Sequence, residues 1–215
     1  MKNKEFRIVY LRRARLTGLI LRFVPYLRMA GLNGSIVRGE ETDKSDIDFL
    51  IIAKARRLYT ARFFATFFVH LTGWRRYGDK IAGRICLNCY LSGENPDIAP
   101  KNPKSRAKVA KAYKYLIPLV ESGRMSEKFF EVNKWFKSYR VAGGSYSVRL
   151  QKKLIPNGPK KPVRFLEIYL KRKFGDWLEK KLMGYQVRRI LAGKVRGDEI
   201  VATKDEIRLH PSKRL

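Results

Sequence analysis

The chain has 215 residues, 45% of them hydrophobic and 12% aromatic, which supports a packed core and excludes wholesale disorder. Forty-eight Lys and Arg residues against 19 Asp and Glu residues give a formal net charge of +29, which favours RNA or DNA as a partner, although a generally basic host proteome would produce the same excess. Two cysteines exclude a disulfide framework and indicate a reducing compartment.

The apolar segments are too short to cross a bilayer. The most apolar one, residues 60–71, contains Arg62 and His70, and charges near the N-terminus interrupt any signal-peptide pattern. We therefore expect a cytoplasmic protein with no membrane partner.

The first hundred residues alternate between helical and strand patterns. Apolar residues recur at helical spacing in two segments, and three other segments have the composition of strands. The predicted helices are residues 6–21 and 56–71, and the predicted strands are residues 26–32, 47–53 and 84–91. These elements predict an α/β (α+β) fold, in which residues 1–100 form a small mixed β-sheet core with flanking helices.

Beyond residue 100 the pattern becomes helical. The predicted elements are a linker at 97–103, helices at 105–120, from Ser126 onward and at 163–191, and a Gly- and Pro-rich loop at 143–162. The remainder, from residue 192, is basic and weakly patterned. We therefore expect residues 101–215 to be a helical C-terminal region with a basic tail.

The residues that carry chemistry lie between the first two predicted strands. Gly34 and Ser35 follow a strand, so backbone N–H groups and a hydroxyl can approach phosphate oxygens without an intervening side chain. Asp46 and Asp48 flank one apolar residue, and strand alternation directs both carboxylates to one face. Such a pair suits Mg²⁺ or Mn²⁺, which is held by a few protein oxygens together with substrate phosphates and water.

This arrangement resembles the DNA polymerase β-like nucleotidyltransferase superfamily, whose signature is a hydrophobic residue, Gly-Ser, a spacer of about ten residues and Asp-hydrophobic-Asp-hydrophobic. Residues 32–35 and 46–49 match the signature, and Arg38-Gly39 and Ser45 fit the spacer. Three shorter matches are similar to a bacterial and archaeal group of minimal nucleotidyltransferase-domain proteins. They are Cys86-Leu87-Asn88, Asn133-Lys134-Trp135 and His210-Pro211.

The resemblance implies a metal-dependent nucleotidyltransferase that moves an NMP from an NTP to a hydroxyl acceptor such as RNA. Asp46 and Asp48 would be the catalytic metal ligands. The nucleotide would be held by Gly34, Ser35, Arg38 and Ser45, although Arg38 could equally face solvent.

Catalytic members of the superfamily usually place a third carboxylate on a later strand, and here the matching strand offers Asn88. Either Asn88 occupies that position, or Asp79, Glu94 or Asp97 reaches into the site. An amide is a poor base and a weak metal ligand. A weakly active or inactive protein of the same fold is therefore the alternative, acting as a nucleotide or nucleic-acid binder or as an antitoxin-like partner of another protein.

Two further sequence patterns can be explained either by function or by structure alone. Basic residues alternate with aromatic ones at 113–115, 134–140 and 169–174, which suits single-stranded nucleic acid or, equally, helices whose aromatic side chains face the core. Cys86 and Cys89 should point to opposite faces of their strand, which predicts structural cysteines and not a shared metal site.

Overall fold

The computed structural model describes residues 2–100, 102–154, 158–169, 173–193 and 199–210. Its centre is a six-stranded mixed sheet with the strand order β4-β1-β2-β3-β6-β5. The strands are β1 (Leu27–Asn33), β2 (Ile47–Ala53), β3 (Ile85–Ser92), β4 (Ile117–Glu121), β5 (Glu199–Ala202) and β6 (Glu206–His210). Of these six strands, only β2 and β3 pair with each other in parallel. The predicted fold class, a mixed α/β (α+β) protein, is confirmed.

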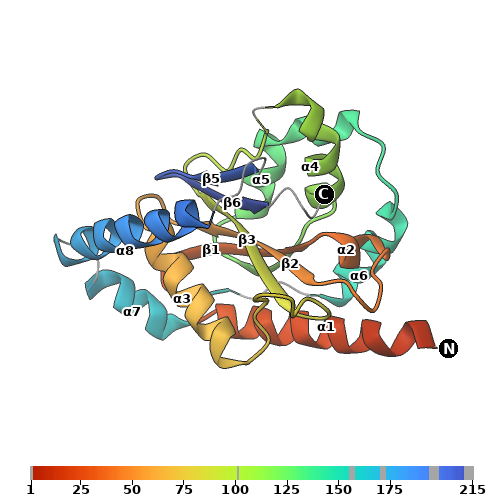
Figure 1. Ribbon diagram of the computed structural model, residues 1–215, viewed down its shortest axis with the longest axis horizontal. Helices are drawn as coiled ribbons and strands as arrows, with labels where there is room; N and C mark the ends of the chain where they lie inside the picture. The colour runs from red at the N-terminus through yellow and green to blue at the C-terminus, as the bar shows by residue number, and fades with distance from the viewer. Residues whose placement is uncertain (1, 101, 155–157, 170–172, 194–198, 211–215) are drawn as a thin grey trace.

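Helices cover both faces of the sheet, with α4 and α5 on one face and α1 and α3 on the other (Figure 1). The α-helices are α1 (Lys2–Leu21), α2 (Ser35–Arg38), α3 (Leu58–Leu71), α4 (Arg106–Tyr113), α5 (Met125–Val132), α6 (Gly144–Lys153), α7 (Lys161–Tyr169) and α8 (Lys173–Ala192). Two short 3₁₀ helices span Pro103–Ser105 and Lys134–Ser138. Among the described residues, no helix is both long enough and apolar enough to cross a membrane.

The central strand β2 explains why there are two apolar cores. Its side chains alternate, so Phe49 and Ile51 pack with α1 and α3, while Leu50 and Ile52 pack with α4 and α5. Residues 49–53 are all fully buried, as expected for a strand covered on both faces. The same alternation places Asp48 on the face that α4 and α5 cover.

Residues 101–215 contain the expected helices, but strands that the sequence did not predict also lie there. Three of the six strands, β4, β5 and β6, lie in this part of the chain and pair with β1 and β3, so one sheet continues across the expected boundary at residue 100. In β4 the apolar run contains Pro118, which a helix interior does not tolerate but an edge strand does.

Two other segments beyond residue 100 also differ from the expectation. The predicted loop at 143–162 contains α6, because Leu150 and Leu154 are buried against the main core. Within the described residues, the weakly patterned tail pairs as β5 and β6, and Pro211 lies outside them. The helix predicted at 163–191 corresponds to α7 and α8, which are separated by residues outside the described ranges.

Asn133, which belongs to the second short sequence match, is a structural residue. Its side chain is fully buried, accepts a hydrogen bond from the Ile98 N–H at 3.0 Å and donates to the carbonyl of Pro96 at 2.9 Å. The Trp135 indole donates to the same Asn133 oxygen at 3.2 Å. The motif therefore ties the linker to the region after α5, because buried backbone groups of the linker need these partners.

Candidate metal and nucleotide site

The predicted acidic pair lies where three neighbouring strands meet at one end of the sheet. Asn33, the last residue of β1, pairs with Asp48 of β2, and Asp48 pairs in turn with Cys86 of β3. Asp46 immediately precedes β2. Because directly opposed residues on adjacent strands point to the same face, their side chains converge above this end of the sheet.

Asp46, Asp48 and Cys86 form a group that could hold a metal ion. One potential ligand atom from each lies within 4.8 Å of the others, and all three residues are partly buried. Among the described residues this is the only such group of three, so Asp79, Glu94 and Asp97 do not supply a third carboxylate here. The three strands therefore build a site with two carboxylates and one thiol.

Asn88 lies in this site because β3 contains a β-bulge. Phe49 pairs with Leu87 and Leu50 with Cys89, so Asn88 is an extra residue without a partner on β2. Its side-chain amide donates a hydrogen bond to Asp48 Oδ1 at 2.9 Å. The expectation that Cys86 and Cys89 face opposite sides is wrong, because the bulge directs Cys89 into the core that contains Leu50.

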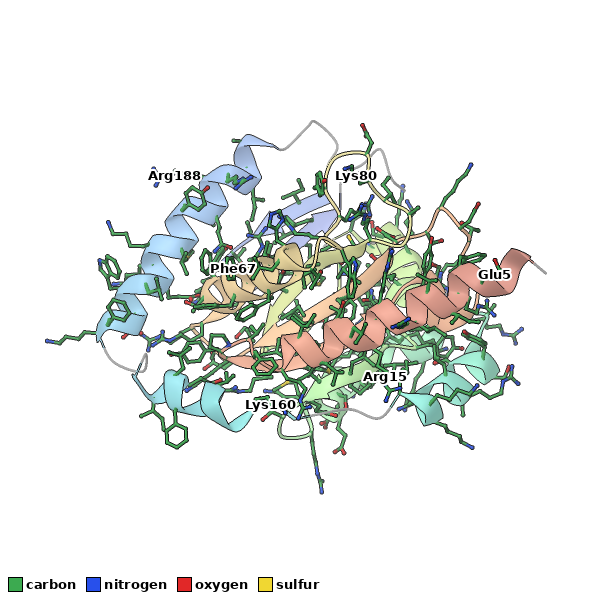
Figure 2. All side chains as sticks on the ribbon, turned by 90° about the horizontal axis from the view of Figure 1, so that it is seen from below. Glu5, Arg15, Phe67, Lys80, Lys160 and Arg188 are labelled. Carbon is green, nitrogen blue, oxygen red and sulfur yellow. The ribbon has the colours of Figure 1, made fainter. Side chains whose placement is uncertain are left out.

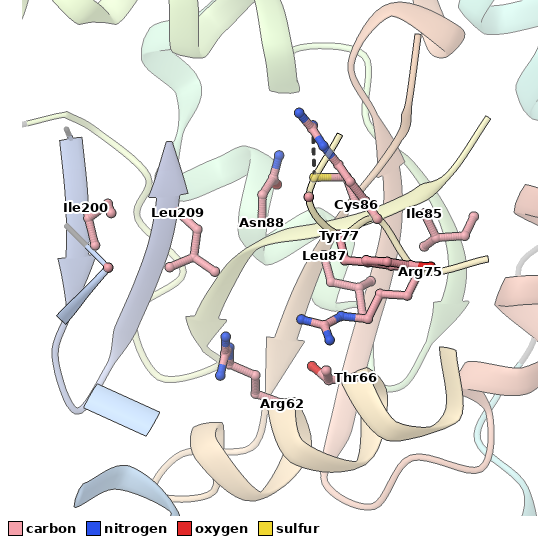
Figure 3. A pocket seen from close by; sticks show the side chains of 13 residues that line it. Arg62, Thr66, Arg75, Tyr77, Ile85, Cys86, Leu87, Asn88, Ile200 and Leu209 are labelled. Carbon is pink, nitrogen blue, oxygen red and sulfur yellow. Dashed lines mark hydrogen bonds between the residues drawn. The ribbon is translucent and has the colours of Figure 1, made fainter. Parts of the chain in front are cut away.

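Arg76 is a member of the site that the sequence motif did not reveal. Its guanidinium forms an ion pair with Asp46. It also donates to the Cys86 sulfur at 3.6 Å, an interaction drawn as the dashed line in Figure 3. The backbone of Arg76 is fixed by a 2.9 Å hydrogen bond to the carbonyl of Ile85 at the start of β3. The Arg76 guanidinium thus contacts the carboxylate pair and compensates part of its negative charge, as a metal ion would.

Gly34 lies in contact with Asp48, and no other residue type fits there. Its backbone has φ of 78° and ψ of −151°, a conformation essentially restricted to glycine. A Cβ at this position would lie 2.4 Å from Asp48 Oδ2. The Gly-Ser pair and the acidic pair are therefore one unit, since the missing side chain of Gly34 makes room for the carboxylate.

The other predicted nucleotide-binding residues differ in what they contact. The buried Arg38 guanidinium donates to the carbonyls of Gly34 at 2.8 Å and Lys111 at 2.7 Å, and it pairs with Glu40. Arg38 therefore positions the Gly34 backbone. These contacts occupy its Nε and Nη1 atoms, and its phosphate contact stays a prediction.

Ser45 and Ser35 also differ in what their hydroxyl groups contact. The Ser45 hydroxyl accepts a hydrogen bond from the Thr42 N–H at 2.9 Å and so shapes the turn that leads into β2. Ser35 begins α2, and among the described residues its hydroxyl has no hydrogen-bond partner. Of the two serines, Ser35 is the one whose hydroxyl has no partner among the described residues, whereas that of Ser45 already contacts Thr42.

Several buried polar atoms around the acidic pair lack partners among the described residues. They are Asn33 Oδ1, Asn88 Oδ1, Arg76 Nε and the Tyr113 hydroxyl. Tyr113 lies on α4 close enough for the charge of Asp48 to contribute to raising the pKa of its hydroxyl, which burial raises most. Buried polar atoms without partners are rare in folded proteins, and their concentration at one place indicates a site that is completed by a ligand, ion or water.

The pKa of Asp48 is raised to about 7, mainly by burial and next by the charge of Asp46, against the opposing effects of Arg76, Asn88 and Cys86. Burial also raises the pKa of the Cys86 thiol well above its ordinary value. Without a metal ion, Asp48 therefore retains a proton to near neutral pH, and Cys86 stays a neutral thiol.

The raised pKa of Asp48 predicts an unusual pH dependence of stability. In a chelator, the folded state keeps this proton up to about pH 7, whereas the unfolded state loses it near 3.8. The folded state then binds more protons in that window, so the free energy of unfolding should fall by up to about 4 kcal/mol between these pH values.

Urea denaturation of the wild type and of Asp48→Asn between these pH values measures this contribution. The wild type should lose more stability than Asp48→Asn as the pH rises. The exposed Asp79 serves as a control, because Asp79→Asn should keep the wild-type profile. Parallel profiles for the wild type and Asp48→Asn would contradict the assignment.

Comparison with protein-family models, with curated proteins and with solved structures finds no match to this chain. The geometry of the site and the sequence signature are therefore the observations that bear on the function of this protein.

Proposed function

We propose that this protein is a divalent-metal-dependent nucleotidyltransferase that moves an NMP from an NTP to a hydroxyl acceptor. The observation that carries the proposal is the contact between Gly34 and Asp48, because it unites the glycine-serine turn with the paired carboxylates. A phosphate-binding backbone beside metal-binding carboxylates is the combination that nucleotidyl transfer requires.

The residues fit a divalent cation with oxygen ligands, Mg²⁺ or Mn²⁺. Asp46 and Asp48 would hold it, and the partnerless oxygens of Asn33 and Asn88 could accept hydrogen bonds from its water ligands. Such an ion would stabilise negative charge on the α-phosphate and lower the pKa of the acceptor hydroxyl.

The protein groups would act by positioning the NTP. The Ser35 N–H and hydroxyl would contact the triphosphate. Gly34 is held in place, because its N–H donates to the carbonyl of Ala112 at 3.0 Å and its carbonyl accepts from Arg38. The acceptor oxygen forms a bond to the α-phosphorus, the bond to the bridging oxygen breaks, and pyrophosphate leaves with its electron pair. The acceptor proton passes to water, because the described part of the site has no third carboxylate to take it.

One observation favours a second function, that of a nucleotide binder with little turnover. Asn88 stands beside Asp48 where a third carboxylate would serve as base, and an amide cannot take the proton. The metal and nucleotide would still bind in this case, and only the transfer step would be slow.

Metal-dependent NTP binding tests the part that both functions share. Calorimetry with Mg²⁺ and a non-hydrolysable NTP should show binding to the wild type and none to Asp46→Asn/Asp48→Asn, because the substitution removes both charged metal ligands. Asp79→Asn/Asp97→Asn is the matched control, since it removes two exposed carboxylates outside the metal-binding group. Equal affinity in the wild type and the site variant would contradict the proposal.

Transfer itself is tested with α-labelled NTPs, Mg²⁺ or Mn²⁺, and total RNA or cell extract. Label that appears in one fraction identifies the acceptor class and separates the enzyme from the binder.

A further inference from the structure

A basic trough adjoins the acidic site between α3, α8 and the edge of β3. It consists of two adjoining cavities of about 290 and 630 Å³ that share Arg62, Arg75, Ile200 and Leu209 in their walls. Figure 3 shows Arg62 and Arg75 reaching toward one space, with Ile200 and Leu209 on its opposite side. Arg189 of α8 lines the larger cavity. We call this feature, defined by Arg62, Arg75 and Arg189, the arginine trough.

The trough reaches the acidic site because part of the β3 edge has no neighbouring strand. Among the described residues, β6 pairs with β3 only over residues 89–91, and Arg75 bridges to Ile85 at the other end. The open segment between them contains Cys86 and Asn88, which line the smaller cavity. Arg76 also lines this cavity, and Arg76 and Asn88 contact Asp46 and Asp48, so the trough borders the acidic site.

The three arginines that define the trough have no acidic partner. Among the described residues, none of them forms an ion pair with a carboxylate. Burial lowers the pKa of Arg62, and the like charges of Arg75 and Arg189 lower it further. Guanidinium groups that are close enough to repel one another, with no compensating acid, form a site that is complementary to an anion.

The trough is preformed, because its two helical walls are linked. The Arg62 guanidinium donates to Gln186 Oε1 at 2.5 Å, and the Gln186 amide donates to the carbonyl of Tyr59 at 3.0 Å. Glu179 of α8 accepts hydrogen bonds from the N–H groups of Tyr59 and Thr60 at 2.8 and 2.9 Å. Arg62 therefore presents its charge from a fixed position.

Exposed aromatic rings accompany the arginines. Phe63, Phe67 and Tyr185 line the larger cavity, and Tyr77 lines the smaller one. All four are between 44% and 57% exposed, which is far more than core packing needs. Phosphate-binding cations beside exposed rings are the combination that holds single-stranded nucleic acid by phosphate contact and base stacking.

We propose that the arginine trough binds single-stranded nucleic acid and leads its end to the acidic site. Arg62, Arg75 and Arg189 contact backbone phosphates, and bases stack on the exposed rings. The strand order supports the approach of the nucleic acid and the NTP from opposite sides of the carboxylates. Gly34 and Ser35 lie on the β1 side, and the trough lies on the β3 side. The role of the bound strand as acceptor rests on the proposed transferase function. The binding of a single strand to the trough does not depend on that function.

The test is fluorescence anisotropy in EDTA with a labelled, unstructured RNA, with DNA of the same sequence and with the corresponding duplex. Arg75→Gln/Arg189→Gln should weaken single-strand binding about 20-fold at about 0.1 M salt and reduce the salt slope by about 1.4, because each phosphate contact contributes about 0.7. Tyr185→Ala should weaken binding about tenfold through lost stacking. Equal affinity for RNA and DNA would assign recognition to the backbone, and tighter binding of RNA would add a contact to its 2′-hydroxyl.

Arg12→Gln/Arg15→Gln is the matched control, because it removes the same charge from exposed positions on α1, away from α8 (Figure 2). It should change the affinity little. An equal loss in both variants, equally tight binding of the duplex, or equally tight binding of polyglutamate would overturn the proposal.

Metal-dependent NTP binding separates this inference from the proposed function. Arg75→Gln/Arg189→Gln should retain NTP binding, whereas Asp46→Asn/Asp48→Asn should lose it and still bind RNA in EDTA. A site variant that keeps NTP binding would refute the transferase, and a trough variant that keeps full RNA affinity would refute the nucleic-acid site.

Discussion

Gly34→Ala should abolish metal-dependent NTP binding and cost about 3 kcal/mol or more of stability. The new methyl group would meet Asp48 Oδ2 at 2.4 Å, and the backbone of residue 34 holds a conformation that alanine avoids. Either Asp48 moves away from Asp46, or the turn that carries Ser35 shifts. Both outcomes separate the carboxylates from the phosphate-binding backbone.

The control for this substitution is Gly123→Ala. Gly123 also has a positive φ, of 67°, but a Cβ there would have no atom within 4 Å. It should cost only about 1 kcal/mol, from backbone strain, and leave NTP binding intact. Urea denaturation and calorimetry on both variants separate strain from loss of the site. Normal NTP binding by Gly34→Ala would show that the close approach of Gly34 to Asp48 is not needed.

The local part of the site could be predicted from the sequence because it depends on short-range rules. Strand alternation placed Asp46 and Asp48 on one face, and the Gly-Ser pair marked the turn before them. Strands near residues 26–32, 47–53 and 84–91 were also recognisable, since each is a short apolar run bounded by turn residues.

The rest depends on contacts between distant segments, which no local pattern reports. The bulge at Asn88 is a register shift between β2 and β3. Arg76 is brought to the site by the hydrogen bond from its N–H to the carbonyl of Ile85. The strand β6 is defined by its pairing with β3, more than a hundred residues earlier in the chain. The place of Cys86 in the site could have been predicted, because residues 86 and 88 lie two apart on one strand and so share a face with the candidate Asn88.

The suggested nucleic-acid contacts at 113–115 and 134–140 illustrate the same limit. Tyr113 and Phe136 are only 2% and 3% exposed and pack in the core beneath α4 and α5, so these two rings follow the core-facing alternative. The segment 169–174 lies partly outside the described residues. Three of the four exposed rings beside the trough arginines belong to α3 and α8, where the sequence has the pattern of an ordinary apolar helix face.

Asn88→Asp should convert the site into one that depends on metal for its stability. The substitution replaces the amide that donates to Asp48 at 2.9 Å with a carboxylate facing two others. Without a metal, lost hydrogen bonding and repulsion should lower stability by about 3 kcal/mol. At an Mg²⁺ concentration of about 100 times the variant's Kd, binding should return about 2.7 kcal/mol to the variant. The wild type should gain less at the same concentration, because it has one carboxylate fewer and binds the ion more weakly. The metal-induced rise in Tm should therefore be larger in the variant than in the wild type.

Asn88→Leu separates charge from packing, because it removes the same hydrogen bond from Asp48 without adding a carboxylate. Mg²⁺ should not raise its Tm more than it raises that of the wild type. If Asn88→Asp behaves like Asn88→Leu, the side chain at position 88 does not reach the ion.

The rate of nucleotidyl transfer then decides between the two proposed functions. A base at position 88 should raise the rate about 100-fold or more if the missing carboxylate is what limits turnover. An unchanged rate in an active wild type would show that the acceptor proton leaves without help from this strand.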